Sequence, residues 1–133
     1  MILVDSSVWI DFFRNQASPQ ADWLDRNLGE QNLLIGDLIL AEVLRGFRDD
    51  KGFNEAKRLL GRLEQVSLCG EGLAVSAARN FRRLRRLGIT VRGTVDAIIA
   101  TRCIADGYRL LHSDRDFDPF VTHLGLAVVD CGA

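Results

Sequence analysis

Four acidic residues lie far apart in this 133-residue chain, each in an apolar stretch: Asp5 in V-D-S-S-V, Glu42 in L-A-E-V-L, Asp96 in T-V-D-A-I and Asp114 in H-S-D-R-D. A carboxylate removed from water without a partner is strongly unfavourable. Two such charges about 4 Å apart repel each other by roughly 4 kcal/mol at an effective dielectric constant near 20. If the fold brings the four together, a divalent cation such as Mg²⁺ or Mn²⁺ suits their oxygen ligands. These residues therefore suggest metal-dependent phosphodiester chemistry.

Short apolar runs alternate with helical segments along the chain. Strands are expected at residues 1–4, 33–35, 66–68, 109–112 and 127–129. Helices are expected at residues 8–13, 19–28, 38–48, 52–63, 70–87 and 95–106, with Ser6 or Ser7, Asp37 and Thr94 as N-caps. This alternation predicts an α/β fold, a three-layer α/β/α sandwich with a short central parallel sheet.

The expected elements could bring the four acids to one place. Sites in parallel α/β sheets form at the carboxyl ends of the strands. Asp5 follows the first strand directly, and Asp114 follows the strand at 109–112 after one further residue. Glu42 and Asp96 fall in early turns of helices that could begin on the same side. We therefore expect one shared acidic site, although each acid taken alone would also suit a helix cap or a solvated turn.

The composition is that of an ordinary globular protein, with 47% hydrophobic residues, 26% charged residues and a net charge of −1. The length suits a single domain over residues 1–133. The start, M-I-L-V-D, lacks the basic and long apolar regions of a signal peptide. No apolar stretch reaches the roughly 18 residues that a membrane span needs. We expect a cytoplasmic protein without membrane contact.

Three cysteines, Cys69, Cys103 and Cys131, are widely separated and form no C-x-x-C motif. An odd and sparse set argues against a disulfide framework. With only two histidines in the chain, a zinc site of thiolates and imidazoles is not expected either.

Arginine dominates the basic residues, with 15 arginines against two lysines. The helix expected at 70–87 carries an apolar stripe on one face and arginines on another. These arginines could hold RNA phosphates by ion pairing, and the alternative is a solvated or partner-binding face. The residues in question are Arg79, Arg82, Arg83 and Arg86, together with Arg92 in the following segment.

The chain resembles the PIN-domain ribonucleases, and among them the VapC-type toxins of bacterial toxin–antitoxin pairs. Four motifs carry the resemblance, in order and at compatible spacing: V-D-S-S-V-W-I at 4–10, L-I-L-A-E-V-L-R-G at 38–46, T-V-D-A-I-I-A at 94–100 and L-H-S-D-R-D-F at 111–117. Together they extend over essentially the whole chain. One motif alone would be weak, whereas four in sequence are specific.

The resemblance implies a metal-dependent endoribonuclease whose catalytic acids are Asp5, Glu42, Asp96 and Asp114. It implies Mg²⁺ or Mn²⁺ held by Asp5, Asp96 and Asp114, with Asp116 as a rival or an accessory for the fourth acid. Ser7 matches a small polar residue beside the metal site. The partners implied are an RNA substrate, a second copy of the chain in a homodimer, and a cognate antitoxin protein.

Two other functions are possible for an α/β domain with acids at strand ends. A phosphoacceptor receiver-type signalling domain requires clustered acids after the first strand and a lysine at a late strand end. The two lysines of this chain, Lys51 and Lys57, lie mid-chain. A haloacid-dehalogenase-type phosphatase requires a second aspartate two residues after the first, and this chain has Ser7 at that position. A catalytically inactive PIN-like interaction module is the remaining alternative, and with all four acids present nothing in the sequence favours it.

Overall fold

Four short strands form one parallel sheet in the order β3-β2-β1-β4. They are β1 (Ile2–Val4), β2 (Leu33–Gly36), β3 (Glu64–Val66) and β4 (Arg109–Leu111) in a computed structural model that describes residues 1–132. In the register of the sheet, Leu3 of β1 lies opposite Leu34 of β2 and Leu110 of β4. Every residue of β1 and β2 is buried. Such continuous apolar runs are typical of parallel strands covered on both faces.

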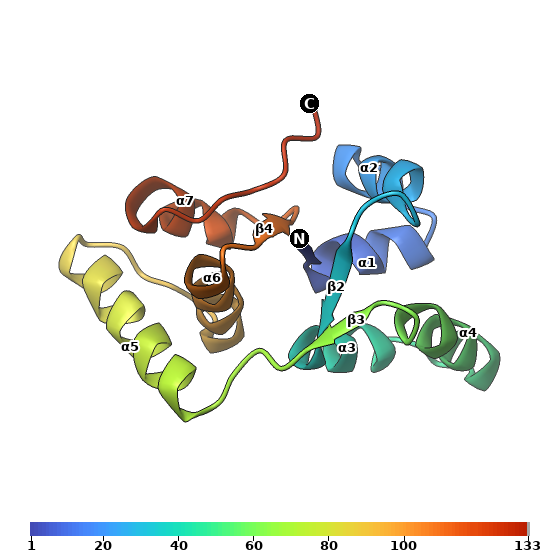
Figure 1. Ribbon diagram of the computed structural model, residues 1–133, viewed down its shortest axis with the longest axis horizontal. Coiled ribbons are helices and arrows are strands. Elements are labelled where there is room, and N and C mark those ends of the chain that lie inside the picture. The colour runs from blue at the N-terminus through green and yellow to red at the C-terminus, as the bar shows by residue number, and fades with distance from the viewer. Residues whose placement is uncertain (133) are drawn as a thin grey trace.

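Helices cover both faces of this sheet, so the predicted three-layer sandwich is confirmed (Figure 1). On one side lie α1 (Ser6–Phe13), α2 (Pro19–Asn27), α3 (Asp37–Leu44) and α4 (Asp50–Leu60). On the other side lie α5 (Glu71–Arg86), α6 (Thr94–Asp106) and α7 (Asp118–Leu124), the last preceded by the 3₁₀ turn η1 (Arg115–Phe117). In the described part of the chain, no helix is both long and apolar enough to cross a membrane.

The core joins the sheet to both helical layers. Trp9 of α1 and Phe117 of η1 are among its largest fully buried side chains. On α5 the predicted apolar stripe packs inward, with Ala77 and Leu84 buried and Phe81 partly buried against the core. The arginine-bearing helix is therefore held to the body of the protein by one face only.

The strand predicted at 127–129 is wrong, because this segment makes only an isolated bridge between Val128 and Leu110. Leu110 donates to the carbonyl of Ala127 at 2.9 Å and accepts from the N–H of Val129 at 3.0 Å. In a three-residue strand only the middle residue turns its N–H and C=O to the free edge, since its two neighbours bond β1. The short edge of β4 thus limits pairing to one residue.

The starts of α3 and α6 differ from the predicted caps. Gly36 and Gly93 are the N-caps of α3 and α6, and neither start has a side-chain cap hydrogen bond. Asp37, an expected cap, instead accepts from the N–H of Leu68 at 3.0 Å and so ties α3 to the segment between β3 and α5. The α7 helix was not predicted at all.

Gly36 provides a test of the packing between β2 and this segment. A Cβ built on Gly36 would overlap the Leu68 side chain, which is fully buried. We expect Gly36→Ala to destabilise the protein by about 1–3 kcal/mol in urea unfolding, the usual effect of overpacking. The control is Gly72→Ala in α5, where a Cβ meets nothing within 4 Å. Equal stability of the two variants would contradict this account.

Candidate metal-binding active site

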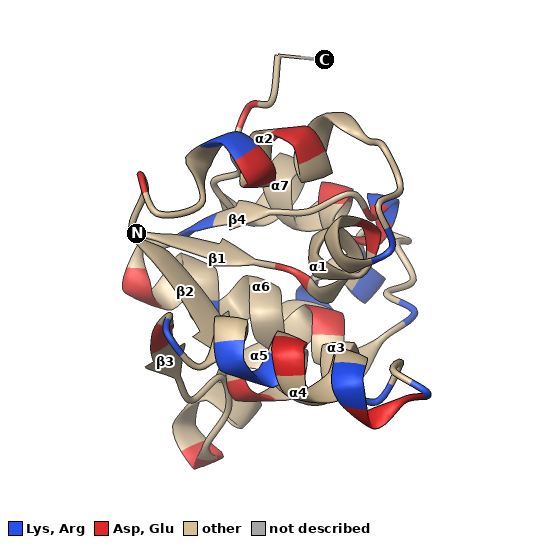
Figure 2. Ribbon diagram, turned by 90° about the vertical axis from the view of Figure 1, so that its right-hand side faces the viewer, with Lys and Arg blue, Asp and Glu red and all other residues tan. Residues whose placement is uncertain are grey.

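The strand order brings the acids to one edge of the sheet. Asp5 follows β1 in the middle of the sheet, and its N–H bonds the carbonyl of Leu111 at the end of β4 at 2.9 Å. The chain leaves β1 into α1 on one face and leaves β4 into η1 and α7 on the other (Figures 1 and 2). Ligands bind in α/β sheets where the chain diverges in this way at the carboxyl ends of two neighbouring strands.

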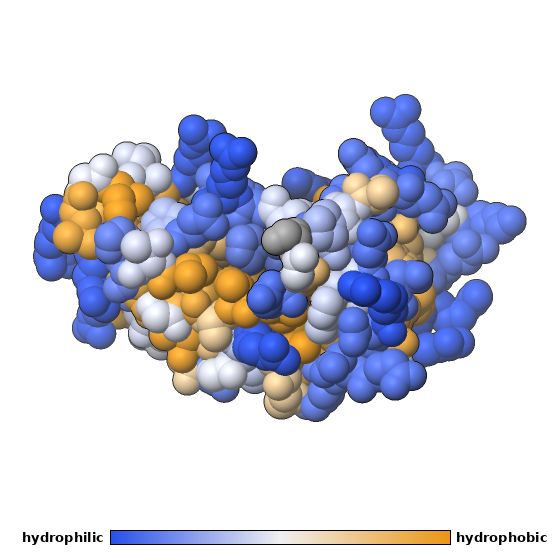
Figure 3. All heavy atoms as spheres, turned by 90° about the horizontal axis from the view of Figure 1, so that it is seen from above, coloured by the Kyte–Doolittle hydropathy of each residue, from blue (hydrophilic) through white to orange (hydrophobic). Residues whose placement is uncertain are grey.

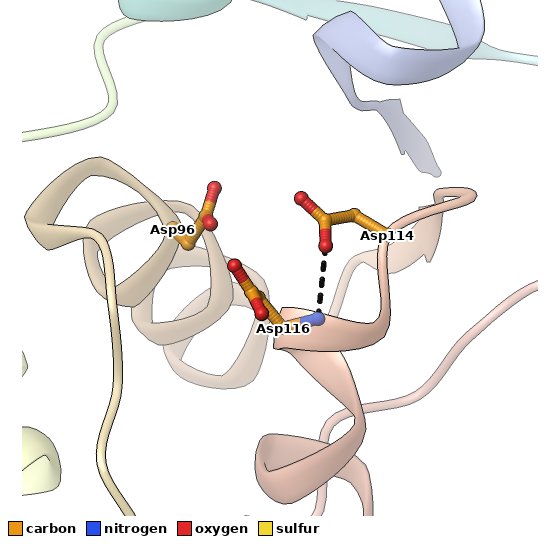
Figure 4. Close-up of side chains that lie close together, drawn as sticks. All are labelled: Asp96, Asp114 and Asp116. Atoms are coloured by element: carbon orange, nitrogen blue, oxygen red, sulfur yellow. Dashed lines mark hydrogen bonds between the residues drawn. The ribbon is translucent and has the colours of Figure 1, made fainter.

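Three carboxylates converge at this edge of the sheet. Asp96 in the first turn of α6, Asp114 after β4 and Asp116 in η1 each offer an oxygen, and these oxygens lie within 4.8 Å of one another. Figure 4 shows the three side chains directed toward a common point, with the N–H of Asp116 bonded to Asp114. Sequence alone left Asp114 and Asp116 as rivals for one position, and the structure brings both to it.

Asp5 lies beside this triad and is almost completely buried, with 3% of its surface exposed. Its carboxylate is the N-cap of α1, a place predicted for Ser6 or Ser7. Oδ2 accepts from the N–H of Ser7 at 3.1 Å and from the Ser7 hydroxyl at 2.5 Å. These donors compensate part of the desolvation of the carboxylate. Ser7 therefore lies next to Asp5 and orients its carboxylate, and its place beside a metal ion stays a prediction.

Glu42 is half-buried on α3, whose Ile39 and Val43 pack into the core. The hydroxyl of Ser6 donates to Glu42 Oε1 at 3.3 Å and so connects α1 to α3. The sequence predicts Ser6 only as a cap. A contact between residues 36 positions apart leaves no local signal in the sequence.

The charges of all five acids act on one another. Burial raises the pKa of Asp96 to about 7, and the neighbouring charges of Asp5, Asp114, Asp116 and Glu42 add to that shift. Burial likewise raises the pKa of Asp5, with a further contribution from the charge of Asp114. Burial first and the charge of Asp5 second raise the pKa of Glu42. Asp5 and Glu42 thus belong electrostatically to the site although they lie outside the 4.8 Å triad.

The site has the properties that a hard divalent cation requires. Its ligands are carboxylate oxygens, they are close together, and they are half-buried. Among the described residues the single salt bridge joins Arg102 and Asp106, so no basic side chain pairs with the cluster. Burial first, and the charges of the neighbouring acids second, raise the pKa of Asp96, and a bound cation would offset both effects.

The predicted basic stripe is on the surface. Arg79, Arg82, Arg83 and Arg86 are all exposed on α5, and Arg92 is exposed in the loop before α6. Asn80 of α5 donates to Thr101 of α6 at 3.0 Å, which holds α5 against the helix that carries Asp96. The arginines are therefore near the acidic helix but outside the acidic cluster.

A family model described as PIN domain matches residues 2–120. The chain belongs to the PIN-domain family. This PIN domain is 36% identical over 120 residues to the ribonuclease VapC11 of Mycobacterium tuberculosis, a match that spans 89% of this chain and 90% of the relative. The recognition of a VapC-type PIN domain from four motifs is thereby confirmed.

Solved structures share the fold. VapBC2 from Rickettsia felis, crystallised with a DNA fragment from its promoter, has a chain that matches with a TM-score of 0.74 at 18% identity, covering 97% of this PIN domain and 98% of that chain. VapC20 of Mycobacterium tuberculosis, described as a sarcin-ricin loop cleaving toxin, matches with a TM-score of 0.67 at 17% identity, covering 89% and 93%. At these low sequence identities, the similarity shows a common fold and nothing beyond it.

The raised pKa of Asp96 predicts how the stability of the metal-free protein depends on pH. In the folded protein this carboxyl stays protonated up to about pH 7, against a usual pKa of 3.8. Its contribution to stability is complete below the unfolded pKa and is lost as the pH rises through about 7. With a chelator present, we expect higher stability in urea unfolding at about pH 5 than at about pH 8.

Asp96→Asn removes this titration, so the difference in unfolding free energy between the two pH values should shrink. Asp22→Asn, at an exposed position on α2, is the control and should leave the difference unchanged. An identical pH dependence in wild type and Asp96→Asn would contradict the raised pKa.

Proposed function

We propose that this PIN domain is a divalent-metal-dependent endoribonuclease and the toxin of a toxin–antitoxin pair. The observation that carries the proposal is the convergence of Asp96, Asp114 and Asp116 within 4.8 Å at the carboxyl edge of the sheet. Relatives named as VapC ribonucleases support RNA as the substrate. The structural neighbour described as cleaving the sarcin-ricin loop supports the same class of substrate.

The residues that would hold the ion are Asp96, Asp114 and Asp116, with Asp5 as the further predicted ligand. Mg²⁺ and Mn²⁺ both suit an all-carboxylate set. A bound ion would lower the pKa of a water molecule, and it would place positive charge beside the phosphoryl oxygens.

The side chains around the ion have separate tasks in this proposal. Ser7 orients the buried Asp5 through two hydrogen bonds. Glu42 lies outside the triad, and its raised pKa suits a group that accepts a proton from the attacking water. Because Ser6 occupies Oε1 of Glu42, we expect the proton to arrive at Oε2. Attack by water, rather than by the ribose 2′-hydroxyl, leaves a 5′-phosphate and a 3′-hydroxyl.

The proposed partners are a cognate antitoxin and a second copy of the chain. Structural neighbours crystallised as VapBC and FitAcB complexes support the antitoxin. Exposed apolar side chains, Val75 and Leu87 from α5 and its end and Val121 from α7, support contact with a protein. Seen from above, apolar surface gathers over the half of the molecule that holds α5 to α7 (Figure 3).

A single domain over residues 1–133, the homodimer and a cytoplasmic location remain predictions.

Membership of the PIN-domain family argues against the receiver-type alternative. In addition, both lysines of the chain lie in α4, away from the strand ends at which a receiver needs one. An inactive PIN-like interaction module is the alternative that experiment must separate from the nuclease. The two differ in whether the carboxylates support cleavage.

Removing one charge from the triad tests the proposed function. We expect Asp96→Asn to lower Mg²⁺- or Mn²⁺-dependent cleavage of total RNA by about 100-fold or more, the order of effect when a preorganised electrostatic group is lost. Expression of the wild type without its antitoxin should arrest growth, and the variant should not. Asp106→Asn, at the exposed end of the same helix, is the control and should cleave normally. Undiminished metal-dependent cleavage by Asp96→Asn would refute the site.

The arginines of α5 are tested by the salt dependence of RNA binding. Each phosphate contact on a single strand contributes about 0.7 to the slope of log K against log salt. We expect Arg82→Gln with Arg86→Gln to weaken binding and to reduce that slope by about 1.4. The matched control, Arg58→Gln with Arg62→Gln, removes two exposed charges at the end of α4 and just after it. A slope equal to that of the wild type would assign the α5 arginines to another role.

A further inference from the structure

The turn between β4 and α7 carries two of the three converging carboxylates, and three of its backbone N–H groups donate to side chains. The N–H of Ser113 donates to the Ser7 hydroxyl at 3.3 Å. The N–H of Asp114 donates to Nδ1 of His112 at 3.2 Å. The N–H of Asp116 donates to Oδ1 of Asp114 at 2.9 Å. These bonds form a series from α1 to the metal-binding acids, and His112 is the member with no role in the site so far.

His112 is itself anchored in the core. Its ring packs against that of Phe117, with 5.0 Å between the centroids and a tilt of 54°. Phe117 is fully buried, so the imidazole rests on a fixed surface. Accepting from an N–H at Nδ1 requires a lone pair there, which places the ring proton on Nε2. The histidine therefore combines an apolar attachment with one directed acceptor.

We propose that His112 is a positioning residue of this site: its Nδ1 holds the backbone of Asp114 so that Asp114 and Asp116 both face Asp96. The inference rests on the proposed function, since it assigns His112 to the same metal-binding turn. The bond is local, from residue i to the N–H of residue i+2, and has the pattern of an Asx-turn. Without the acceptor, the Asp114 N–H would turn to solvent, and both carboxylates would lose their common direction.

Four side chains at position 112 separate the hydrogen bond from the ring packing. His112→Phe keeps a ring on Phe117 and removes the acceptor. His112→Asn removes the ring and keeps an acceptor suited to an Asx-turn. His112→Ala removes both. The chain thus offers two matched pairs that differ in the acceptor: wild type with His112→Phe, and His112→Asn with His112→Ala. Thermal unfolding of each variant shows which of them fold.

The first measurement is Mn²⁺ binding by calorimetry. We expect His112→Phe to bind roughly 10-fold or more weakly than wild type, the order of effect when a group behind the ligands is removed. His112→Asn should bind at least several-fold more tightly than His112→Ala. His123→Phe, at an exposed position on α7, is the control and should bind as wild type. Wild-type affinity in the Phe variant, or equal affinity in Asn and Ala, would overturn the positioning role.

The second measurement is independent of metal. In the metal-free protein, amide hydrogen exchange at Asp114 should be faster in His112→Phe and His112→Ala than in wild type and His112→Asn. Unchanged exchange in the Phe variant would overturn the inference even if the enzyme is a nuclease. Conversely, a wild type that takes up no Mn²⁺ would refute the proposed function, while the exchange pattern would still report whether His112 holds the turn.

Discussion

Repulsion between like charges at the carboxyl edge of a parallel sheet is the constraint on which this structure depends. Asp96, Asp114 and Asp116 come within 4.8 Å because α6, β4 and η1 are packed in fixed positions around β1. The packing of the rest of the protein must compensate this repulsion, because carboxylates that were free to move would move away from one another. The pKa of Asp96 is raised by burial first and by the neighbouring charges second, so the fold leaves this carboxylate without full compensation. A site of this kind is strained without a cation and is stabilised by one that binds the folded state alone.

Hydrogen-bond donors limit that strain without neutralising the site. Asp5 combines two functions, because the carboxylate that caps α1 is also the most buried acid of the cluster. Ser7 gives it a backbone and a hydroxyl donor and also accepts from Ser113 in the neighbouring turn. Donors of this type orient a carboxylate but leave its charge in place. The negative potential that a cation needs is thus retained while the side chains are held still.

Positive charge is kept apart from the acids. The arginines of α5 are exposed, and that helix is attached through its apolar stripe and through the bond from Asn80 to Thr101. Across the described residues the single salt bridge, Arg102 to Asp106, lies at the far end of α6 from Asp96. A basic surface beside an acidic cluster that no basic side chain pairs suits a polyanionic substrate, which would contact the arginines along its backbone while one phosphate reaches the cluster.

The sequence by itself determined the layers of the fold and the list of acids, because both depend on local sequence patterns. Apolar runs predict buried strands, and acids that follow those runs predict a shared edge of the sheet. It did not determine the caps of α3 and α6, the single bridge at Val128, or the helix α7. Three features became visible only in three dimensions: the convergence of both Asp114 and Asp116 on Asp96, the bond from Ser6 to Glu42, and the bond from the N–H of Asp114 to His112. Those features depend on distances of a few ångströms between side chains, which the packing of whole elements sets and which no local pattern records.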